Sequence, residues 1–229
     1  ALARAAVAIG VPVIYSLAGR TTPKSVPDVE VRSGGFGGGD ALADYLRRKD
    51  ILAVIDATHA YAARISENAR LACQMAERPL LRLQEPPWRE VPGDNWQQVP
   101  NITTARDTAA KTMARTFVST GRQGMVELAD DRRCWWLARV ISPGADLPAL
   151  SNGRYIFARG PFDLAGELAL LRQHRISAVI SKNAGGSATY AKIAAARQLG
   201  LPVIMIARPD VVAVPEAETV GDAIAWLQD

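Results

Sequence analysis

The stretch Ile51-Leu52-Ala53-Val54-Ile55-Asp56-Ala57-Thr58-His59, at residues 51–59, decides the fold of this chain. Its first five residues are continuously apolar, which predicts a strand buried on both faces of a parallel sheet. Polar residues follow at once, and residues 59–76 then carry a stripe of apolar side chains at helical spacing. A strand, a polar turn and an amphipathic helix in this order form the repeating unit of α/β proteins.

The same unit recurs along the chain of 229 residues. We expect further strands at residues 11–17, 29–32, 80–83, 116–120, 134–141, 155–159, 178–181 and 203–207. We expect further helices at residues 1–9, 41–48, 104–115, 124–129, 163–174, 189–199 and 219–228, with Asp163 as one N-cap.

The Pro-containing stretch 84–101 predicts a linker. We therefore expect an α/β protein of two domains, residues 1–95 and 96–229, each with a mostly parallel sheet. A doubly wound domain begins with a strand and its phosphate-binding turn, whereas this chain opens on a predicted helix. We therefore expect a strand upstream of residue 1.

Composition and charge narrow the function classes. The net charge is +4 and the isoelectric point about 9.3, but the basic residues are scattered and form no run of five, which argues against nucleic-acid binding. Arginine makes up most of the 27 basic residues, and its guanidinium pairs bidentately with carboxylate and phosphate. This bias suits a polyanionic small molecule, and a GC-rich genome that favours arginine codons explains it equally well.

The sequence shows no targeting or metal signal. No apolar run approaches about 18 residues and no signal-peptide pattern opens the chain, so we expect a cytoplasmic protein without a membrane span. Cys73 and Cys134 have no paired spacing, and we expect two structural thiols, no disulfide and no metal. Zinc spacings, a nucleophile elbow and a Cys–His pair are missing, which leaves hydrolytic and metal chemistry without support.

The unusual residues of the first half follow predicted strands, at the carboxyl ends where parallel sheets bind ligands. Arg20 stands at a strand tip where a basic residue accommodates the extra phosphate of NADP. The glycine string at 34–39 lets backbone amides approach a phosphate. His59 would begin a helix, where we expect a neutral imidazole that can hydrogen-bond a substrate. The alternatives are a solvated arginine, a plain flexible loop and a histidine that only caps its helix.

Two loops of the second half carry cations next to glycines. Lys182 precedes a glycine pair, and Arg122 follows another predicted strand. In each loop several donors could contact one anion. The residues expected to contact it are Thr120, Gly121, Arg122, Lys182, Asn183, Gly185, Gly186 and Thr189. A structural loop is the alternative.

These loops make the sequence resemble the precorrin-6A reductase family over nearly its whole length. The stretches that carry the resemblance include Tyr15-Ser16-Leu17-Ala18-Gly19-Arg20-Thr21, Ser33-Gly34-Gly35-Phe36-Gly37-Gly38, Ile55-Asp56-Ala57-Thr58-His59, Ser119-Thr120-Gly121-Arg122 and Ser181-Lys182-Asn183. Each is short, and their order and spacing make the likeness specific. The sequence departs from the family at Ala60, where proline is usual, and at Ala184, where serine is usual. It also lacks the family's opening strand with its Gly-Gly-Thr-type turn.

The resemblance implies two Rossmann-like domains, NADPH as the cofactor, and hydride delivery to the conjugated tetrapyrrole of precorrin-6A. The implied product is precorrin-6B of cobalamin (vitamin B12) biosynthesis, or its cobalt form in the anaerobic branch. The implied cofactor-binding residues are Ala18, Gly19, Arg20, Thr21, Ser33, Gly34, Gly35, Phe36, Gly37 and Thr58. The implied substrate-binding residues are those of the two cationic loops together with His59. His59 and Lys182 are the catalytic candidates, and another group or water is the alternative proton source.

Two other hypotheses stay open. One is a reductase of the same fold that acts on a different conjugated substrate. The other is a non-enzymatic, two-lobed module that binds an anion without chemistry. The missing signal-peptide pattern counts against a periplasmic binding protein, and Arg20 counts for a cofactor. The oligomeric state is left open, with a monomer among the options.

Overall fold

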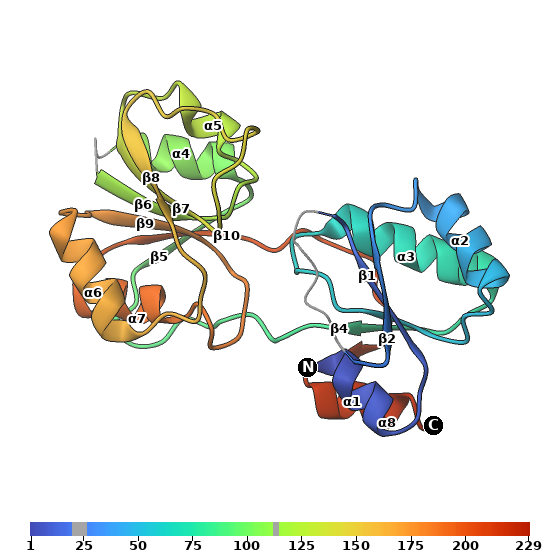
Figure 1. The fold of residues 1–229 in the computed structure, drawn as a ribbon. Helices are drawn as coiled ribbons and strands as arrows, with labels where there is room; N and C mark the ends of the chain where they lie inside the picture. The colour runs from blue at the N-terminus through green and yellow to red at the C-terminus, as the bar shows by residue number, and fades with distance from the viewer. Residues whose placement is uncertain (20–26, 112–114) are drawn as a thin grey trace. The chain divides into compact units, whose positions relative to one another are not determined.

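The computed structural model describes residues 1–19, 27–111 and 115–229, which fold into two compact units (Figure 1). Unit 1 comprises Ala1–Glu85 and Asp210–Asp229, and unit 2 comprises Pro86–Pro209. The chain thus divides differently from the expected boundary at residues 95 and 96. Residues 86–95 join unit 2 because Asp94 pairs with Arg197 at 2.8 Å, and the C-terminal segment returns to unit 1 as an added strand.

Unit 1 contains two short parallel sheets. One pairs β1 (Val13–Leu17) with β2 (Val29–Ser33). The other has the order β11-β4-β3 and consists of β3 (Val54–Asp56), β4 (Leu80–Leu83) and β11 (Glu216–Ala217). Strand β11 therefore pairs with a strand more than 130 residues earlier in the chain, and Arg82 Nη1 donates to Glu216 Oε1 at 3.1 Å across this pair.

The helices of unit 1 are α1 (Leu2–Ala8), α2 (Gly39–Arg48), α3 (Ala63–Ala76) and α8 (Val220–Trp226). Helices α2 and α3 lie side by side, as do α1 and α8, where both chain ends lie (Figure 1). The expected apolar stripe of residues 59–76 includes Ala69, Ala72 and Cys73, which are buried against Ala43 and Leu46 of α2. This part of the helix prediction is confirmed.

Unit 2 is built on one six-stranded parallel sheet with the order β5-β10-β9-β6-β7-β8. The strands are β5 (Trp96–Val99), β6 (Arg115–Ser119), β7 (Trp135–Val140), β8 (Gly153–Phe157), β9 (Ala178–Lys182) and β10 (Val203–Ile206). Strand β5 lies inside the stretch predicted as a linker. Its two consecutive glutamines, Gln97 and Gln98, hid it, because an edge strand paired only with β10 buries few of its side chains.

The helices of unit 2 are α4 (Ile102–Ala110), α5 (Val126–Ala129), α6 (Leu164–Gln173) and α7 (Ala191–Gln198). Helices α4 and α5 cover one face of the sheet, and α6 and α7 the other (Figure 1). The predicted cap is confirmed, because Asp163 Oδ1 accepts a hydrogen bond from Gly166 N at 2.7 Å. Phe117, Leu137, Val179 and Ile193 lie at the centre of the core between sheet and helices.

Both units are mixed α/β, and all their strand pairs are parallel within the described residues, as expected. None of the helices in this part of the chain is long and apolar enough to cross a membrane.

Candidate functional site

A buried carboxylate shapes the turn after β3. Asp56 is 5% exposed, and its Oδ1 accepts hydrogen bonds from Thr58 N at 3.0 Å and Thr58 Oγ1 at 2.6 Å. Gln84 Nε2 donates to the Thr58 carbonyl at 2.6 Å, and Nε of the buried Arg82 lies 3.9 Å from Asp56 Oδ2. The predicted cofactor residue Thr58 is therefore held by Asp56, the last residue of β3, and by Gln84, which directly follows β4. Arg82 and Gln84 were not predicted, since nothing in their local sequence marks them.

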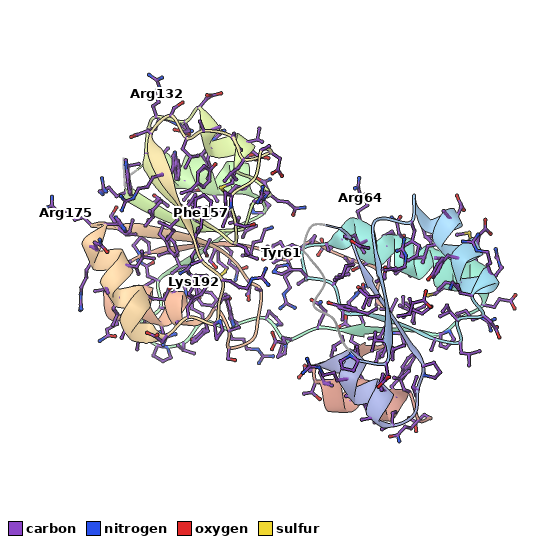
Figure 2. All side chains as sticks on the ribbon, viewed as in Figure 1. Tyr61, Arg64, Arg132, Phe157, Arg175 and Lys192 are labelled. Atoms are coloured by element: carbon purple, nitrogen blue, oxygen red, sulfur yellow. The ribbon has the colours of Figure 1, made fainter. Side chains whose placement is uncertain are left out.

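His59 lies in a turn before helix α3. The prediction that it begins the helix is wrong, because α3 begins at Ala63 with Ala62 as its N-cap. Residues 59–62 instead form a turn in which Ala62 N donates to the His59 carbonyl at 2.7 Å. Tyr61, labelled in Figure 2, donates its backbone N–H to His59 Nδ1 at 3.2 Å. Since Nδ1 accepts this bond, a neutral imidazole here carries its proton on Nε2.

The loops after β1 and β2 lie against each other. Gly34 N donates to the Leu17 carbonyl at 2.8 Å, and a Cβ added to Gly19 would lie 3.5 Å from Gly34 N. Gly34 and Gly37 have φ angles of 113° and 94°, which side-chain-bearing residues rarely adopt. The predicted cofactor residues that these loops contain are Ala18, Gly19, Ser33, Gly34, Gly35, Phe36 and Gly37. The predicted Arg20 and Thr21 lie outside the described residues.

An arginine orders the glycine string. Arg32 Cζ lies 3.7 Å from the centre of the Phe36 ring, and Arg32 Nη1 donates to Ser16 Oγ at 2.9 Å and to the Gly34 carbonyl at 3.0 Å. The Phe36 ring also contacts Tyr45 of α2, with centroids 5.1 Å apart. The string is therefore a shaped turn ahead of α2, whose N-terminus can attract an anion. Arg32 was missed by the sequence prediction.

In unit 2 the predicted anion-binding loops follow neighbouring strands. Ser119 of β6 is paired with Ser181 of β9, so Thr120 and Lys182 occupy the next position on adjacent strands. Thr120 is 5% exposed, and its Oγ1 has no hydrogen-bond partner among the residues the structure describes. Burial lowers the pKa of Lys182 below its ordinary value. The structure thus brings together two of the predicted substrate residues.

Two other predicted ligand-binding side chains are bonded to the protein. Asn183 Oδ1 accepts a hydrogen bond from Trp88 N at 2.7 Å, and Asn183 Nδ2 donates to the Trp88 carbonyl at 3.0 Å. Arg122 forms an ion pair with Asp146, and its Nη2 donates to the Ser142 carbonyl at 2.8 Å. Both side chains therefore shape loops in this structure. The predicted Gly121, Gly185 and Gly186 all have positive φ, and the Thr189 carbonyl accepts a hydrogen bond from Lys192.

Three charged residues are buried in unit 2: Arg139 of β7, Glu167 of the first turn of α6 and Lys192 of the first turn of α7. Arg139 Nη1 and Nη2 donate to the two carboxylate oxygens of Glu167 at 2.5 and 2.9 Å, next to a cavity of about 260 Å³ that Phe162 also lines. Burial, and after it the charge of Arg139, lowers the pKa of Lys192 to about 7. No group of three or more His, Cys, Asp or Glu side chains that could hold a metal occurs among the described positions.

The sequence matches known families along its whole length. Residues 1–228 match the family model described as precorrin-6x reductase CbiJ/CobK. A precorrin-6A reductase of Rhodococcus erythropolis is 42% identical over 221 residues, which cover 95% of this chain and 88% of the relative. A cobalt-precorrin-6A reductase of Methanothermobacter thermautotrophicus is 32% identical over 184 residues, covering 75% of this chain and 59% of the relative.

A solved structure is similar to this one. The structure described as CobK precorrin-6A reductase has a TM-score of 0.91 and 38% sequence identity, over 99% of this chain and 90% of that chain. The resemblance inferred from short motifs is thus confirmed by both sequence and fold. The chain belongs to the precorrin-6x reductase (CbiJ/CobK) family.

Proposed function

We propose that this chain reduces precorrin-6A to precorrin-6B in cobalamin biosynthesis, with NADPH as the hydride donor. The observation that carries the proposal is the match of residues 1–228 to one family of reductases. In the reaction the macrocycle gains one hydride and one proton, and NADP⁺ is released. Family membership favours this function over the same-fold reductase of another substrate and over the non-enzymatic module.

The strand orders support two Rossmann-like domains. The doubly wound order is 3-2-1-4-5-6, and ligands bind where it reverses. In unit 2, β8-β7-β6-β9-β10 follow 3-2-1-4-5, with β5 in the sixth place. In unit 1, β2-β1 matches positions 3-2 of this order, and β3-β4-β11 matches positions 4-5-6. Position 1 of the order would therefore fall between β1 and β3.

The cofactor fits the loops of unit 1. A Cβ added to Gly34, Gly35 or Gly38 would meet no atom within 4 Å, so the backbone there is open to a close-lying phosphate. These loops follow β1 and β2, and the Thr58 turn follows β3, at the predicted reversal point of the strand order. NADPH, when bound, supplies the hydride. The chain's residues have to bind it, orient it and exclude water.

The substrate fits the reversal point of unit 2. There Lys182 ends β9, Thr120 follows the adjacent strand β6, and Gly185 and Gly186 come shortly after Lys182 with positive φ angles. A precorrin carries several carboxylates, and an ammonium group with nearby backbone amides binds a carboxylate well. No nucleic-acid, membrane or protein partner is part of the proposal. The expected cytoplasmic location stays a prediction, and the oligomeric state stays open.

His59 and Lys182 are the proposed catalytic residues. The Tyr61 N–H donates to His59 Nδ1, so a neutral ring carries its proton on Nε2, the nitrogen from which it would donate. Lys182 is a second donor, because burial eases the loss of its proton. Replacement separates them: His59→Gln and Lys182→Met should differ in kcat, and the donor is the residue whose loss removes one limb of the pH–rate profile.

A spectroscopic assay tests the function directly. Purified protein, NADPH and precorrin-6A should give an enzyme-dependent change in the macrocycle's absorption and a matching loss of NADPH absorbance. No change in either would refute the proposed reductase and favour the non-enzymatic module.

Cofactor preference tests the assignment of Arg20. A guanidinium–phosphate hydrogen bond contributes about 1.5–3 kcal/mol, so NADPH should bind roughly 10- to 100-fold more tightly than NADH. Arg20→Ala should remove most of this preference, while Arg4→Ala, a change at an exposed arginine of α1, should leave it intact. Equal affinities in the wild type, or an unchanged preference in Arg20→Ala, would contradict the assignment.

A further inference from the structure

Residue 88 lies in the stretch that the sequence predicts to be a linker, yet it is bonded to the loop after β9. Trp88 exchanges two hydrogen bonds between its backbone and the Asn183 side chain, at 2.7 and 3.0 Å. Its indole Nε1 donates to the Gly186 carbonyl at 2.7 Å. One residue therefore makes three hydrogen bonds to a single loop.

The same indole contacts the far end of the loop. The Trp88 ring centre lies 4.7 Å from Lys192 Nζ, which donates to the Thr189 carbonyl at 2.7 Å. The rings of Trp88 and Tyr190 lie 5.6 Å apart. Trp88 thus touches residues at the beginning, the middle and the end of the loop of residues 183–190.

The two glycines do not fix the shape of the middle of the loop by themselves. Gly185 and Gly186 have φ angles of 79° and 68°, in a region that glycine enters without strain but does not enforce. Arg208 fixes the first two carbonyls, with Nε 2.9 Å from the Asn183 oxygen and Nη2 3.0 Å from the Ala184 oxygen. Beyond that point, the Gly186 carbonyl is held by Trp88.

We infer that Trp88 is a positioning residue for substrate binding: its indole N–H holds Gly186 so that the loop after Lys182 presents its backbone amides to a carboxylate of the tetrapyrrole. The inference rests on the proposed function, because that function makes this loop a substrate contact. Trp88 acts through the loop and does not itself touch the reacting atoms.

A pair of matched substitutions tests this role. Trp88→Phe keeps an aromatic ring near Lys192, replaces the larger indole and loses the N–H that reaches Gly186. Trp96→Phe is the control, because Trp96 packs against the same core and its buried Nε1 has no hydrogen-bond partner in the described part of the chain. Both variants lose one indole, but only the first loses a hydrogen bond.

Loss of one hydrogen bond should raise the KM for precorrin-6A about fivefold in Trp88→Phe. We expect kcat and the Kd of NADPH to stay unchanged, and Trp96→Phe to match the wild type in all three. An unchanged KM in Trp88→Phe with a lowered melting temperature would overturn the inference, because it would make the tryptophan a stability element only.

Hydrogen exchange measured by mass spectrometry, without substrate, tests the anchor separately. Amides of residues 184–189 should exchange faster in Trp88→Phe than in the wild type, and Trp96→Phe should leave them unchanged. Equal exchange in the two variants would refute the anchoring role even if the enzyme is active. A wild type that leaves precorrin-6A unreduced would instead refute the proposed function, while the exchange experiment would still decide on the anchor.

Discussion

Replacing Lys192 with methionine tests how a buried amine affects the stability of unit 2. Lys192, labelled in Figure 2, is 3% exposed, and its Nζ donates to the Thr189 carbonyl at 2.7 Å. Burial and the charge of Arg139 lower its pKa from an ordinary value of 10.5 to about 7, against the opposing effect of Glu167. Methionine has a similar length and no charge, so the substitution removes the titration and keeps most of the packing.

The pH dependence follows from the lowered pKa. Between pH 7 and 10.5 the unfolded chain holds a proton on Lys192 that the folded chain has released. The unfolded state therefore binds more protons, and the free energy of unfolding rises with pH in this interval. One proton of difference between the two states changes the free energy of unfolding by about 1.4 kcal/mol per pH unit. Between pH 7, where the folded state is about half protonated, and pH 9, the free energy of unfolding should therefore rise by about 2 kcal/mol. Lys192→Met lacks this rise. The free energy of unfolding of the wild type should therefore increase by that amount relative to the variant between pH 7 and pH 9.

Urea unfolding followed by tryptophan fluorescence at pH 7, 8 and 9 measures this difference. The signal reports mainly on unit 2, where four of the five tryptophans lie: Trp88, Trp96, Trp135 and Trp136. Lys111→Met, at an exposed lysine of the same unit, is the control and should run parallel to the wild type. Parallel profiles for the wild type and Lys192→Met would show that Lys192 keeps an ordinary pKa, and would refute the reasoning.

Two predictions concern unit 1 and the thiols. Asp56→Ala removes both hydrogen bonds to Thr58 and a carboxylate near the buried Arg82. Thermal unfolding followed by circular dichroism should therefore show that the free energy of unfolding falls by about 2–4 kcal/mol. Asp56→Asn keeps the Oδ1 acceptor and should lose less stability. Cys73 and Cys134 are buried, and burial raises the pKa of Cys73 to about 11, so iodoacetamide at pH 8 should label neither thiol in native protein and both in urea; a native adduct at Cys73 detected by mass spectrometry would contradict this.

The alternation of apolar strands and amphipathic helices was predictable because it is a local pattern. The helix cap at Asp163 was predictable for the same reason, since the capping bond spans three residues. The pairing of β11 with β4 was not, because a two-residue strand has no periodicity and its partner lies elsewhere in the sequence. The return of the last 20 residues to unit 1 was missed for this reason.

The helix expected at His59 shows the limit of pattern reasoning at a boundary. The apolar stripe continues only from Ile65 onward, and no residue before it distinguishes a helical start from a turn. Two short-range bonds decide for the turn, from Ala62 N to the His59 carbonyl and from Tyr61 N to His59 Nδ1. A histidine side chain that accepts from the backbone two residues ahead competes with helix formation, as short polar side chains do. The position of His59 after β3 was predictable, and its orientation was not.

Some of the predicted site residues use their polar atoms to shape a loop, and this decides how they can contribute to ligand binding. A polar side chain after a strand meets the same requirement whether it shapes a loop or binds a ligand, because both tasks need donors and acceptors at the carboxyl end of the sheet. Asn183 has both ends of its amide bonded to Trp88, and Arg122 has its guanidinium bonded to Asp146 and a carbonyl. Ligand contacts near these two side chains therefore fall more readily to the backbone amides of the loops. A substitution of Asn183 should therefore act on substrate binding through the shape of the loop, whereas one of Lys182 should act through lost charge.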